Sequence, residues 1–535
     1  MRESVTPSLP PPGRERLASA TILGAAATSL ALYAWNALRL VRYPWDWTPD
    51  EGLDLDWARR LLEAPSTLYD AGSVVPFPCA YGPALPLLLA PVVALAGSPL
   101  LAARLLALAW TACGAAVVYR LVRREGPAPL AAAAAALSLA ALDVTYWSMH
   151  VRVDGLLLAL WLLSALALMP RRLERGADRL GTGRLVSGTA LLLAATLAKP
   201  TAALHGLPLV LAWLLVDLRS AVVLALALGA SGLAALGALQ WATSGGFLAV
   251  ARLWTHHPSF PGQTAPIVKF YLSRTAPLFL PLAAALVVSR ARGRLLRDGS
   301  LVLLAGALAS LPLMDKSGAT WNYLVLLPPA VAVVAGRWWA GSEESARRPL
   351  LGAALTASVA LGLALTRVFP LPTPEDERTA RAFYDYITSE VARSGGPILA
   401  SRPAYAYWLV GQPVEIEGSG FPYLVEAGAP GSERVLERLR RREYTLLAMS
   451  WELPQSAEYW AAIEAAYEHV GGCDVRHSLG MQHAHIFVRR DLRRIQRPPP
   501  GARCGTSIRI PKAAPPERAS TRPEGLDYFP VRNGE

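Results

Sequence analysis

Two adjacent carboxylates, Asp50 and Glu51, form the first candidate for chemistry in this chain. They lie in the stretch Asp46-Trp47-Thr48-Pro49-Asp50-Glu51-Gly52, shortly after an apolar run long enough to cross a bilayer. Carboxylates at the edge of a membrane can act as a general base, as metal ligands, or as both. The alternative interpretation is a solvated polar loop, because acidic loops are common.

Charged residues inside or beside later apolar runs are the second group of candidates. Arg152 and Asp154 are two positions apart, so they do not face each other on a helix and each needs another partner. The alternative is a structural ion pair between helices. Lys199 lies late in another apolar run, where a lysine either binds an anion such as phosphate or carboxylate or extends to the membrane surface.

The remaining candidates come from three polar segments: Tyr81, Lys269, Arg274, Lys316, Asn322 and Tyr323. Tyr81-Gly82-Pro83 either supplies a tyrosine to a site or simply starts a helix, and Lys316-Ser317-Gly318 is also compatible with a plain turn. The neighbours His256 and His257 are weak evidence for a metal, because one loop does not easily aim both rings at one ion. We therefore expect no assigned metal site, although a divalent metal ion at the carboxylates stays open.

The composition tells us which elements must position these residues. The chain has 535 residues, of which 53% are hydrophobic and only 17% charged, with a mean hydropathy of +0.31. An average soluble domain carries about a quarter charged residues. This composition excludes an ordinary cytosolic enzyme, a fibrous protein and a disordered protein, and it predicts a polytopic helical membrane protein.

The formal net charge of +12 does not indicate a nucleic-acid partner. The arginines stand in short clusters between apolar runs, as the positive-inside rule requires of cytoplasmic loops. The clusters predict a cytoplasmic segment 1–16 and about eleven transmembrane helices. These spans are expected at 17–40, 98–119, 127–143, 147–169, 185–203, 206–217, 221–242, 271–289, 299–314, 322–339 and 350–367.

Two parts of the chain are expected outside the cytoplasm. The first is an outer loop, 43–97, which ends in a juxtamembrane or re-entrant helix at 83–97. The second is a small α/β domain at 370–496, with helices at 375–393, 432–442 and 458–469 and short strands at 397–401, 413–416 and 485–489. A disordered tail is expected at 497–535. Cys473 and Cys504 either pair in an oxidising compartment or stay free.

Taken in order, these motifs resemble the GT-C glycosyltransferases, most closely the branch of protein O-mannosyltransferases and lipid A aminoarabinose transferases. The resemblance covers about residues 17–367. It rests on Asp50-Glu51, Tyr81-Gly82-Pro83, Ala103-Arg104-Leu105, Arg152-Val153-Asp154, Lys199-Pro200, Lys316-Ser317-Gly318 and Asn322-Tyr323. Tyr-Gly-Pro and Lys-Pro depart from the commoner Tyr-Pro-Pro and Thr-Lys of these families.

The resemblance implies an integral membrane transferase of hexosyl or pentosyl groups. Such an enzyme moves sugar from a polyprenyl-phosphate donor to an acceptor (a protein, a lipid or a glycan) at the outer face of the inner, or plasma, membrane. Asp50 and Glu51 would be catalytic, and Tyr81, Asp154, Asn322 and Tyr323 would bind substrate. The donor phosphate would be held by cations, for which the candidates are Arg152, Lys199, Lys269, Arg274 and Lys316. Two alternatives are a transporter or lipid flippase, and a structural membrane protein whose C-terminal domain binds a partner.

Overall fold

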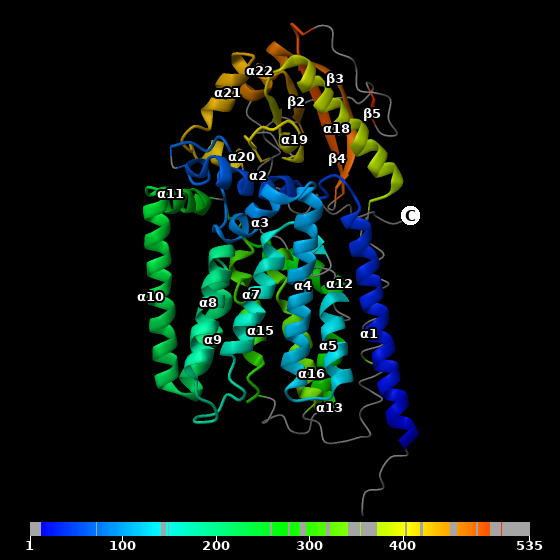
Figure 1. Cartoon of the computed structure of the whole chain (residues 1–535), viewed down its shortest axis with the longest axis vertical. Helices are drawn as coiled ribbons and strands as arrows, with labels where there is room; N and C mark the ends of the chain where they lie inside the picture. Colours follow the sequence, from blue (N-terminus) through cyan, green and yellow to red (C-terminus); the bar gives the residue numbers. More distant parts are fainter. Residues whose placement is uncertain are drawn as a thin grey trace, which may run out of the picture.

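The structure is a computed structural model of the whole chain. It describes residues 12–70, 72–140, 146–147, 149–256, 259–275, 279–288, 296–316, 321–340, 354, 372–401, 404–417, 421–449, 457–477, 480–492 and 504–505. Figure 1 shows a bundle of roughly parallel helices with a mixed helix and sheet region above one end. We call the end of the bundle that faces this region the upper end.

Apolar helices form the bundle, and four of them are long and apolar enough to cross a membrane: Ala20–Val41, Pro99–Arg123, Leu218–Ala242 and Asn322–Ala340. The bundle contains α1 (Pro12–Val41), α4 (Pro99–Arg123), α5 (Ala128–Ala140), α7 (Val153–Leu168), α8 (Thr182–Ala198), α9 (Ala202–Val216), α10 (Leu218–Ala242), α12 (Thr264–Thr275), α13 (Leu280–Val288), α15 (Leu301–Leu308) and α16 (Leu327–Ala340). Its core is rich in Leu, Val, Ala and Trp, including Trp161 and Trp213. The prediction of a mostly helical membrane protein is thus confirmed.

Several predicted spans are broken or displaced in the structure. The predicted fourth span, 147–169, begins as α7 only at Val153, and the predicted span 271–289 covers the end of α12 and then α13. The predicted span 299–314 is α15 followed by the 3-10 turn Leu311–Leu313. The predicted span 350–367 lies outside the described residues apart from Ala354. The count of about eleven spans therefore stays a prediction.

A layer of short helices caps the upper end of the bundle (Figure 1). It contains α2 (Pro49–Glu63), the 3-10 turn Pro65–Thr67, α3 (Ala84–Leu95), α11 (Gly246–Leu253) and a 3-10 turn at Trp254–His256. The twelve residues of α3 confirm a short helix at 83–97. Helix α2 was not expected within the first outer loop.

The described residues of the C-terminal region form five helices and a five-stranded mixed sheet. The helices are α18 (Pro374–Ser394), α19 (Ala404–Leu409), α20 (Phe421–Glu426), α21 (Glu433–Arg440) and α22 (Ala457–Ala466). The strands β1 (Ile398–Ala400), β2 (Leu446–Met449), β3 (Tyr467–His477), β4 (Gly480–Arg489) and β5 (Cys504–Gly505) pair in the order β1-β2-β4-β3-β5. Among the described strands, β1 and β2 pair in parallel and the other pairs are antiparallel. Helix α18 begins with a capping box between Thr373 and Asp376, which satisfies amides of its first turn.

Three details of the C-terminal region differ from the sequence prediction. Residues 413–416 do not form a strand; their backbone instead bonds to the first outer loop, where Phe77 N donates to Val414 O at 2.8 Å. The predicted helix at 458–469 ends at Ala466 because β3 begins at the next residue. The sheet extends into the predicted tail at β5, and most of that tail lies outside the described residues.

Of the two alternatives for Cys473 and Cys504, the structure favours pairing over free thiols. Cys473 is disulfide-bonded, and Cys504 lies opposite it in the register of β3 and β5. The other two cysteines, Cys79 and Cys113, are free. Such a bond would hold β5 against the edge of the sheet.

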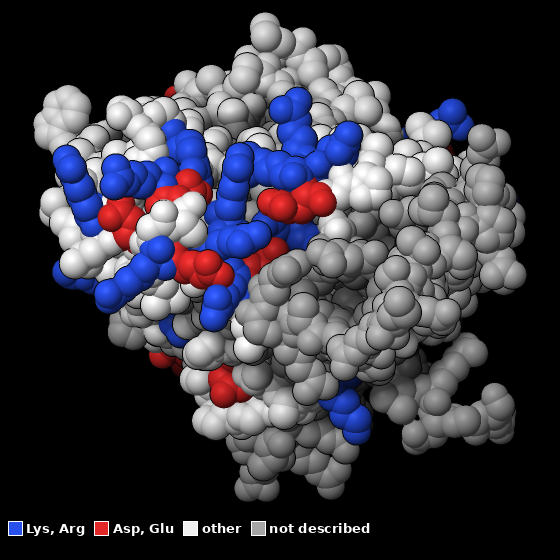
Figure 2. All heavy atoms as spheres, turned by 90° about the horizontal axis from the view of Figure 1, so that it is seen from below, with Lys and Arg blue, Asp and Glu red and all other residues white. Residues whose placement is uncertain are grey.

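The lower face of the bundle carries clustered Lys and Arg side chains with acidic residues between them (Figure 2). Arg120 and Arg123 end α4, and Arg171, Arg172 and Arg175 follow α7. If this face is cytoplasmic, a reporter fused after Arg175 should read cytoplasmic and one fused after Glu426 extracytoplasmic. If both reporters read the same side, the predicted number of spans between residues 175 and 426 would be wrong by an odd number.

Candidate active site

Asp50 lies in the first turn of α2, at the upper end of the bundle. Pro49 begins the helix, where its missing N–H removes no hydrogen bond. The acidic residues of the first turn interact favourably with the positive end of the helix dipole and so stabilise the helix. The Asp50 side chain is 32% exposed and forms an ion pair with Arg152. Asp50 is therefore both held in place and accessible.

Glu51, its neighbour, is completely buried. Its two carboxylate oxygens accept from Arg104 Nε at 2.8 Å and Nη2 at 2.6 Å, and also from the backbone N–H groups of Trp47 and Val151. Burial by itself would raise the pKa of Glu51, but the charge and hydrogen bonds of Arg104, together with the nearby His150, outweigh burial, so the pKa lies below its ordinary value. Glu51 is thus an ionised carboxylate whose oxygens already accept four hydrogen bonds from the protein itself.

Arg152 connects Asp50 to a second carboxylate. Its Nε donates to Asp154 Oδ2 at 3.1 Å, and its guanidinium lies 4.5 Å from the ring centroid of Trp147. The expectation that Arg152 and Asp154 do not face each other assumed that both are helical. It was wrong because Arg152 caps α7 with an extended backbone, φ −149° and ψ 155°, and so reaches forward to Asp154.

Lys199 lies in the break between α8 and α9, also at the upper end. Its Nζ is 2.7 Å from Asp154 Oδ1 and 4.9 Å from the ring centroid of Tyr323. The side chain is almost fully buried, so it binds a partner and does not extend into water. Asp50, Arg152, Asp154 and Lys199 thus form one chain of alternating charges, which we call the charge chain.

The tyrosines lie around the charge chain. Tyr81 precedes Gly82, where a Cβ would lie 1.9 Å from the Leu197 carbonyl oxygen at the end of α8, so Gly82 allows the first outer loop to approach Lys199. Burial raises the pKa of Tyr81 well above its usual range, and the nearby Asp154 and Tyr323 raise it further. Tyr81 therefore stays a neutral hydrogen-bonding group. Asn322 is buried in the same short turn as Tyr323.

The other predicted cations lie elsewhere or are not described. Lys269 is exposed on α12, and the Lys316 backbone pairs with Ser259 in an isolated bridge. Within the described residues, no hydrogen bond or ion pair joins either lysine to the charge chain. The side chain of Arg274 and residues 317–320 lie outside what the structure describes.

Two buried charged residues near the site, Arg104 and Asp54, were not singled out from the sequence. Arg104 was noted only as part of a motif, yet it is fully buried and also donates to the carbonyl oxygens of Leu40, Tyr43 and Trp45. An arginine within a predicted span was the signal that could have marked it. Asp54 lies one helical turn after Asp50 in α2, and burial and the charges of Asp154 and Glu51 raise its pKa well above its usual range.

The described residues contain no group of three or more His, Cys, Asp or Glu side chains arranged to hold a metal ion. His257 and the side chain of His256 lie outside the described part of the chain. Two of the buried carboxylates pair with protein cations: Glu51 pairs with Arg104, and Asp154 pairs with both Arg152 and Lys199.

Two solved structures of ArnT from Cupriavidus metallidurans share the fold. The apo form matches with a TM-score of 0.51 at 16% identity, and the form bound to undecaprenyl phosphate with 0.53 at 14%. Both matches cover 86% of this chain and 98% of the other. The oligosaccharyltransferase AglB from Archaeoglobus fulgidus, in complex with an inhibitory peptide and a dolichol-phosphate, matches with a TM-score of 0.48 at 13% identity, over 84% of this chain and 72% of its own.

The ArnT matches show that this chain has the fold of those two structures. Residues 80–241 also match the family model described as dolichyl-phosphate-mannose-protein mannosyltransferase. No curated protein sequence is similar enough to count as a match. The resemblance to GT-C mannosyltransferases and the ArnT branch, expected from the motifs, is thus confirmed.

Proposed function

We propose that the protein transfers a sugar from a polyprenyl-phosphate donor to an acceptor at the upper end of the bundle. The observation that carries this proposal is the charge chain, which pairs the partly exposed Asp50 with Arg152 and links Arg152 through Asp154 to Lys199, at the ends of membrane helices. A lipid-linked donor cannot leave the membrane, so its phosphate has to react at this level. The family match over 80–241 and the ArnT-like fold support the same chemistry.

In the proposed reaction, Asp50 accepts the proton of an acceptor hydroxyl or amine as that group attacks the anomeric carbon. The bond between this carbon and the phosphate oxygen breaks, and the polyprenyl phosphate leaves with the electron pair. A single displacement inverts the anomeric centre. Arg152 and Lys199 stabilise the charge that develops on the phosphate.

Arg152 has a double role in this scheme, because it already binds Asp50. A donor phosphate that attracts the Arg152 guanidinium weakens its hold on Asp50 and leaves that carboxylate available to the acceptor. Asp154 keeps both cations near the phosphate, because it contacts Arg152 at 3.1 Å and Lys199 at 2.7 Å.

Replacing Lys199 with Ala should weaken donor binding more than the chemical step. The loss of one charged contact is expected to raise the KM for the donor about ten- to hundredfold, measured as initial rates against donor concentration. Arg175→Ala, an exposed arginine beyond the lower end of α7, serves as the control and should leave the KM unchanged. An unchanged KM in Lys199→Ala would remove Lys199 from the donor site.

A transporter or lipid flippase is the alternative function. Transporters place polar and ionised groups near the middle of the membrane, at the interface of internal repeats. The charge chain lies instead at the upper ends of α7 and α8, which favours a transferase.

The direct test supplies purified protein with a polyprenyl-phosphate sugar labelled in the sugar, together with a membrane extract as the source of acceptor. We expect the label to appear in a product separated from the lipid. Label that stays on the lipid, for hexosyl and pentosyl donors alike, would reject the proposed function.

A further inference from the structure

Helix α2, which carries Asp50, is packed between the membrane helices and the C-terminal region (Figure 1). Residues of the first outer loop share one hydrophobic core with this region, among them Trp57 and Phe77 with Phe383 and Tyr407. Asp50, the candidate base, therefore lies on a helix that both the membrane helices and the C-terminal region contact.

The first polar contact lies just before α2. Asp46 is buried, and its carboxylate accepts from the hydroxyl of Tyr384 on α18 and from the backbone N–H of Tyr405 at 3.4 Å. Trp45 stacks on the Tyr384 ring, with centroids 4.8 Å apart and planes at 20°. Tyr384 thus holds the carboxylate of Asp46 through its hydroxyl and the indole ring of Trp45 through its own ring.

A continuous set of contacts leads from this point to Asp50. The carbonyl of Trp45 accepts from Arg104 Nη2 at 2.7 Å, and Arg104 holds Glu51 through two hydrogen bonds. Glu51 is the neighbour of Asp50 in the first turn of α2. A shift of residues 45–46 would therefore move the turn that presents Asp50.

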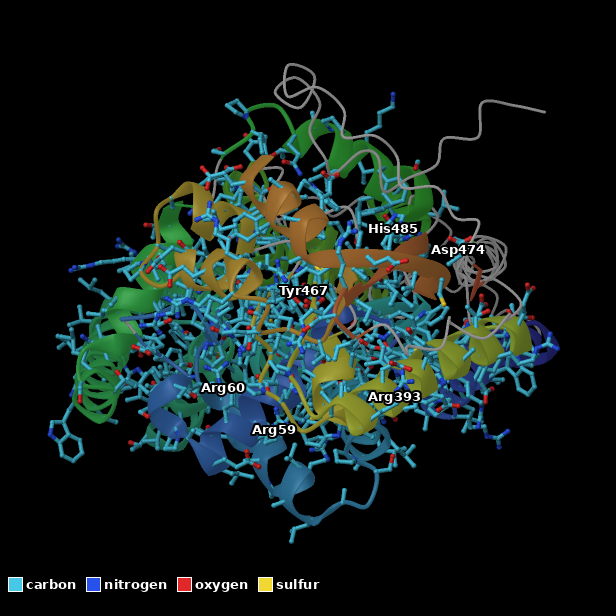
Figure 3. The ribbon with its side chains drawn as sticks, turned by 90° about the horizontal axis from the view of Figure 1, so that it is seen from above. Arg59, Arg60, Arg393, Tyr467, Asp474 and His485 are labelled. Carbon is cyan, nitrogen blue, oxygen red and sulfur yellow. The ribbon has the colours of Figure 1, made fainter. Side chains whose placement is uncertain are left out.

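A second contact holds the middle of α2. Asp56 accepts from Val414 N at 3.2 Å, and Arg59 donates to the Gln412 carbonyl and lies 5.2 Å from the ring centroid of Trp408. Figure 3 shows Arg59 and Arg60 on α2 beside the loops of the C-terminal region. The helix is thus tied to that region at both its start and its middle.

We propose that the C-terminal region is a positioning element of the active site, in which Tyr384 holds residues 45–46 and thereby orients Asp50 toward the acceptor. The inference rests on the proposed function, because it assigns a role to Asp50 in transfer. Tyr384 is a positioning residue, since it contacts neither Asp50 nor any group of the charge chain.

The test compares Tyr384→Phe with Tyr386→Phe. Both residues are buried on α18, but the Tyr386 hydroxyl has no hydrogen-bond partner among the described residues. Each change removes one oxygen and keeps the ring, so the pair is matched. We remove the hydroxyl and not the carboxyl because burial raises the pKa of Asp46 to about 7, so that Asp46→Asn would mimic a form the protein already populates.

We expect Tyr384→Phe to lower kcat about tenfold, the size of effect that a small misplacement of a catalytic group produces, with the KM for the donor unchanged. Hydrogen exchange at the amides of residues 45–52 should become faster. In an Asp50→Asn background the same change should cost nothing further, because the group it orients is already disabled. Tyr386→Phe should show none of these effects.

The outcomes separate the two claims. A wild-type protein that transfers no sugar rejects the proposed function. A wild-type kcat in Tyr384→Phe, with or without faster exchange, overturns the positioning role while leaving the proposed function intact. A fall in kcat that persists in the Asp50→Asn background also overturns it, because the effect would then not act through Asp50.

Discussion

Replacing Asp50 with Asn is expected to slow sugar transfer about 10²–10⁴-fold, the usual contribution of a general base. Asparagine keeps the size and shape of the side chain but cannot accept the acceptor's proton. The protein should still fold, because Asp50 is partly exposed and Arg152 keeps its contact with Asp154. The measurement is kcat of the purified variant, with its thermal unfolding recorded in the same preparation.

Glu63→Gln is the matched control for Asp50→Asn. Glu63 is the last residue of α2, its side chain is 68% exposed, and the substitution again turns a carboxylate into an amide. We expect wild-type kcat in this variant. Near-normal transfer by well-folded Asp50→Asn would remove Asp50 from the reaction and make Asp154 the next carboxylate to test.

Replacing Glu51 with Gln should act on stability, although Glu51 is adjacent to Asp50. The change leaves the buried Arg104 guanidinium without its countercharge, and breaking a buried ion pair typically costs about 3–5 kcal/mol. We expect a lower unfolding temperature and less folded protein in membranes. Thermal unfolding of the purified variant in detergent measures this loss.

Glu63→Gln again provides the comparison, since the Glu63 carboxylate is exposed and its salt bridge with Arg59, at 4.0 Å, contributes little. If Glu51→Gln unfolds at the wild-type temperature and loses only kcat, Glu51 acts in the reaction and is not part of the scaffold. The two adjacent carboxylates would then share the catalytic role that we assign to Asp50.

The sequence was most informative about the membrane helices and the order of the motifs. Apolar runs of spanning length predicted α1, α4 and α10 closely, because helices in a bilayer must be apolar and must satisfy their own backbone. The spans at 271–289 and 299–314 were predicted less well. There the chain breaks into short helices within a protein core, and hydropathy does not mark such breaks.

Helix α2 shows why the outer loop was harder to interpret. Asp54, Asp56 and Arg60 are polar by type yet buried in the fold, so the sequence has no clear apolar stripe. Asp56 accepts a hydrogen bond from Val414 N and Arg60 donates one to the Phe77 carbonyl, and sequence patterns cannot bring these distant residues together. The strand β3 was missed for a related reason, because its Gly471-Gly472 pair and charged residues do not alternate as a half-buried strand should.

For the site, residue types and spacing identified the members of the charge chain but not their pairing. Arg152 pairs with Asp154 only because α7 starts one residue later than Arg152. Lys199 reaches the same carboxylate because the chain breaks at Pro200 and directs its side chain inward. Both facts are properties of helix ends, where predictions from sequence are least exact.

Following sugar and lipid separately in proteoliposomes tests the central claim most directly. The donor would carry one label on the sugar and another on the polyprenyl chain, with acceptor extract added outside the vesicles. We predict that the sugar label moves to the acceptor while the lipid label is recovered as free polyprenyl phosphate, and that Asp50→Asn slows both changes by the same factor. Intact donor that crosses the bilayer with both labels still joined would contradict the account and identify a flippase.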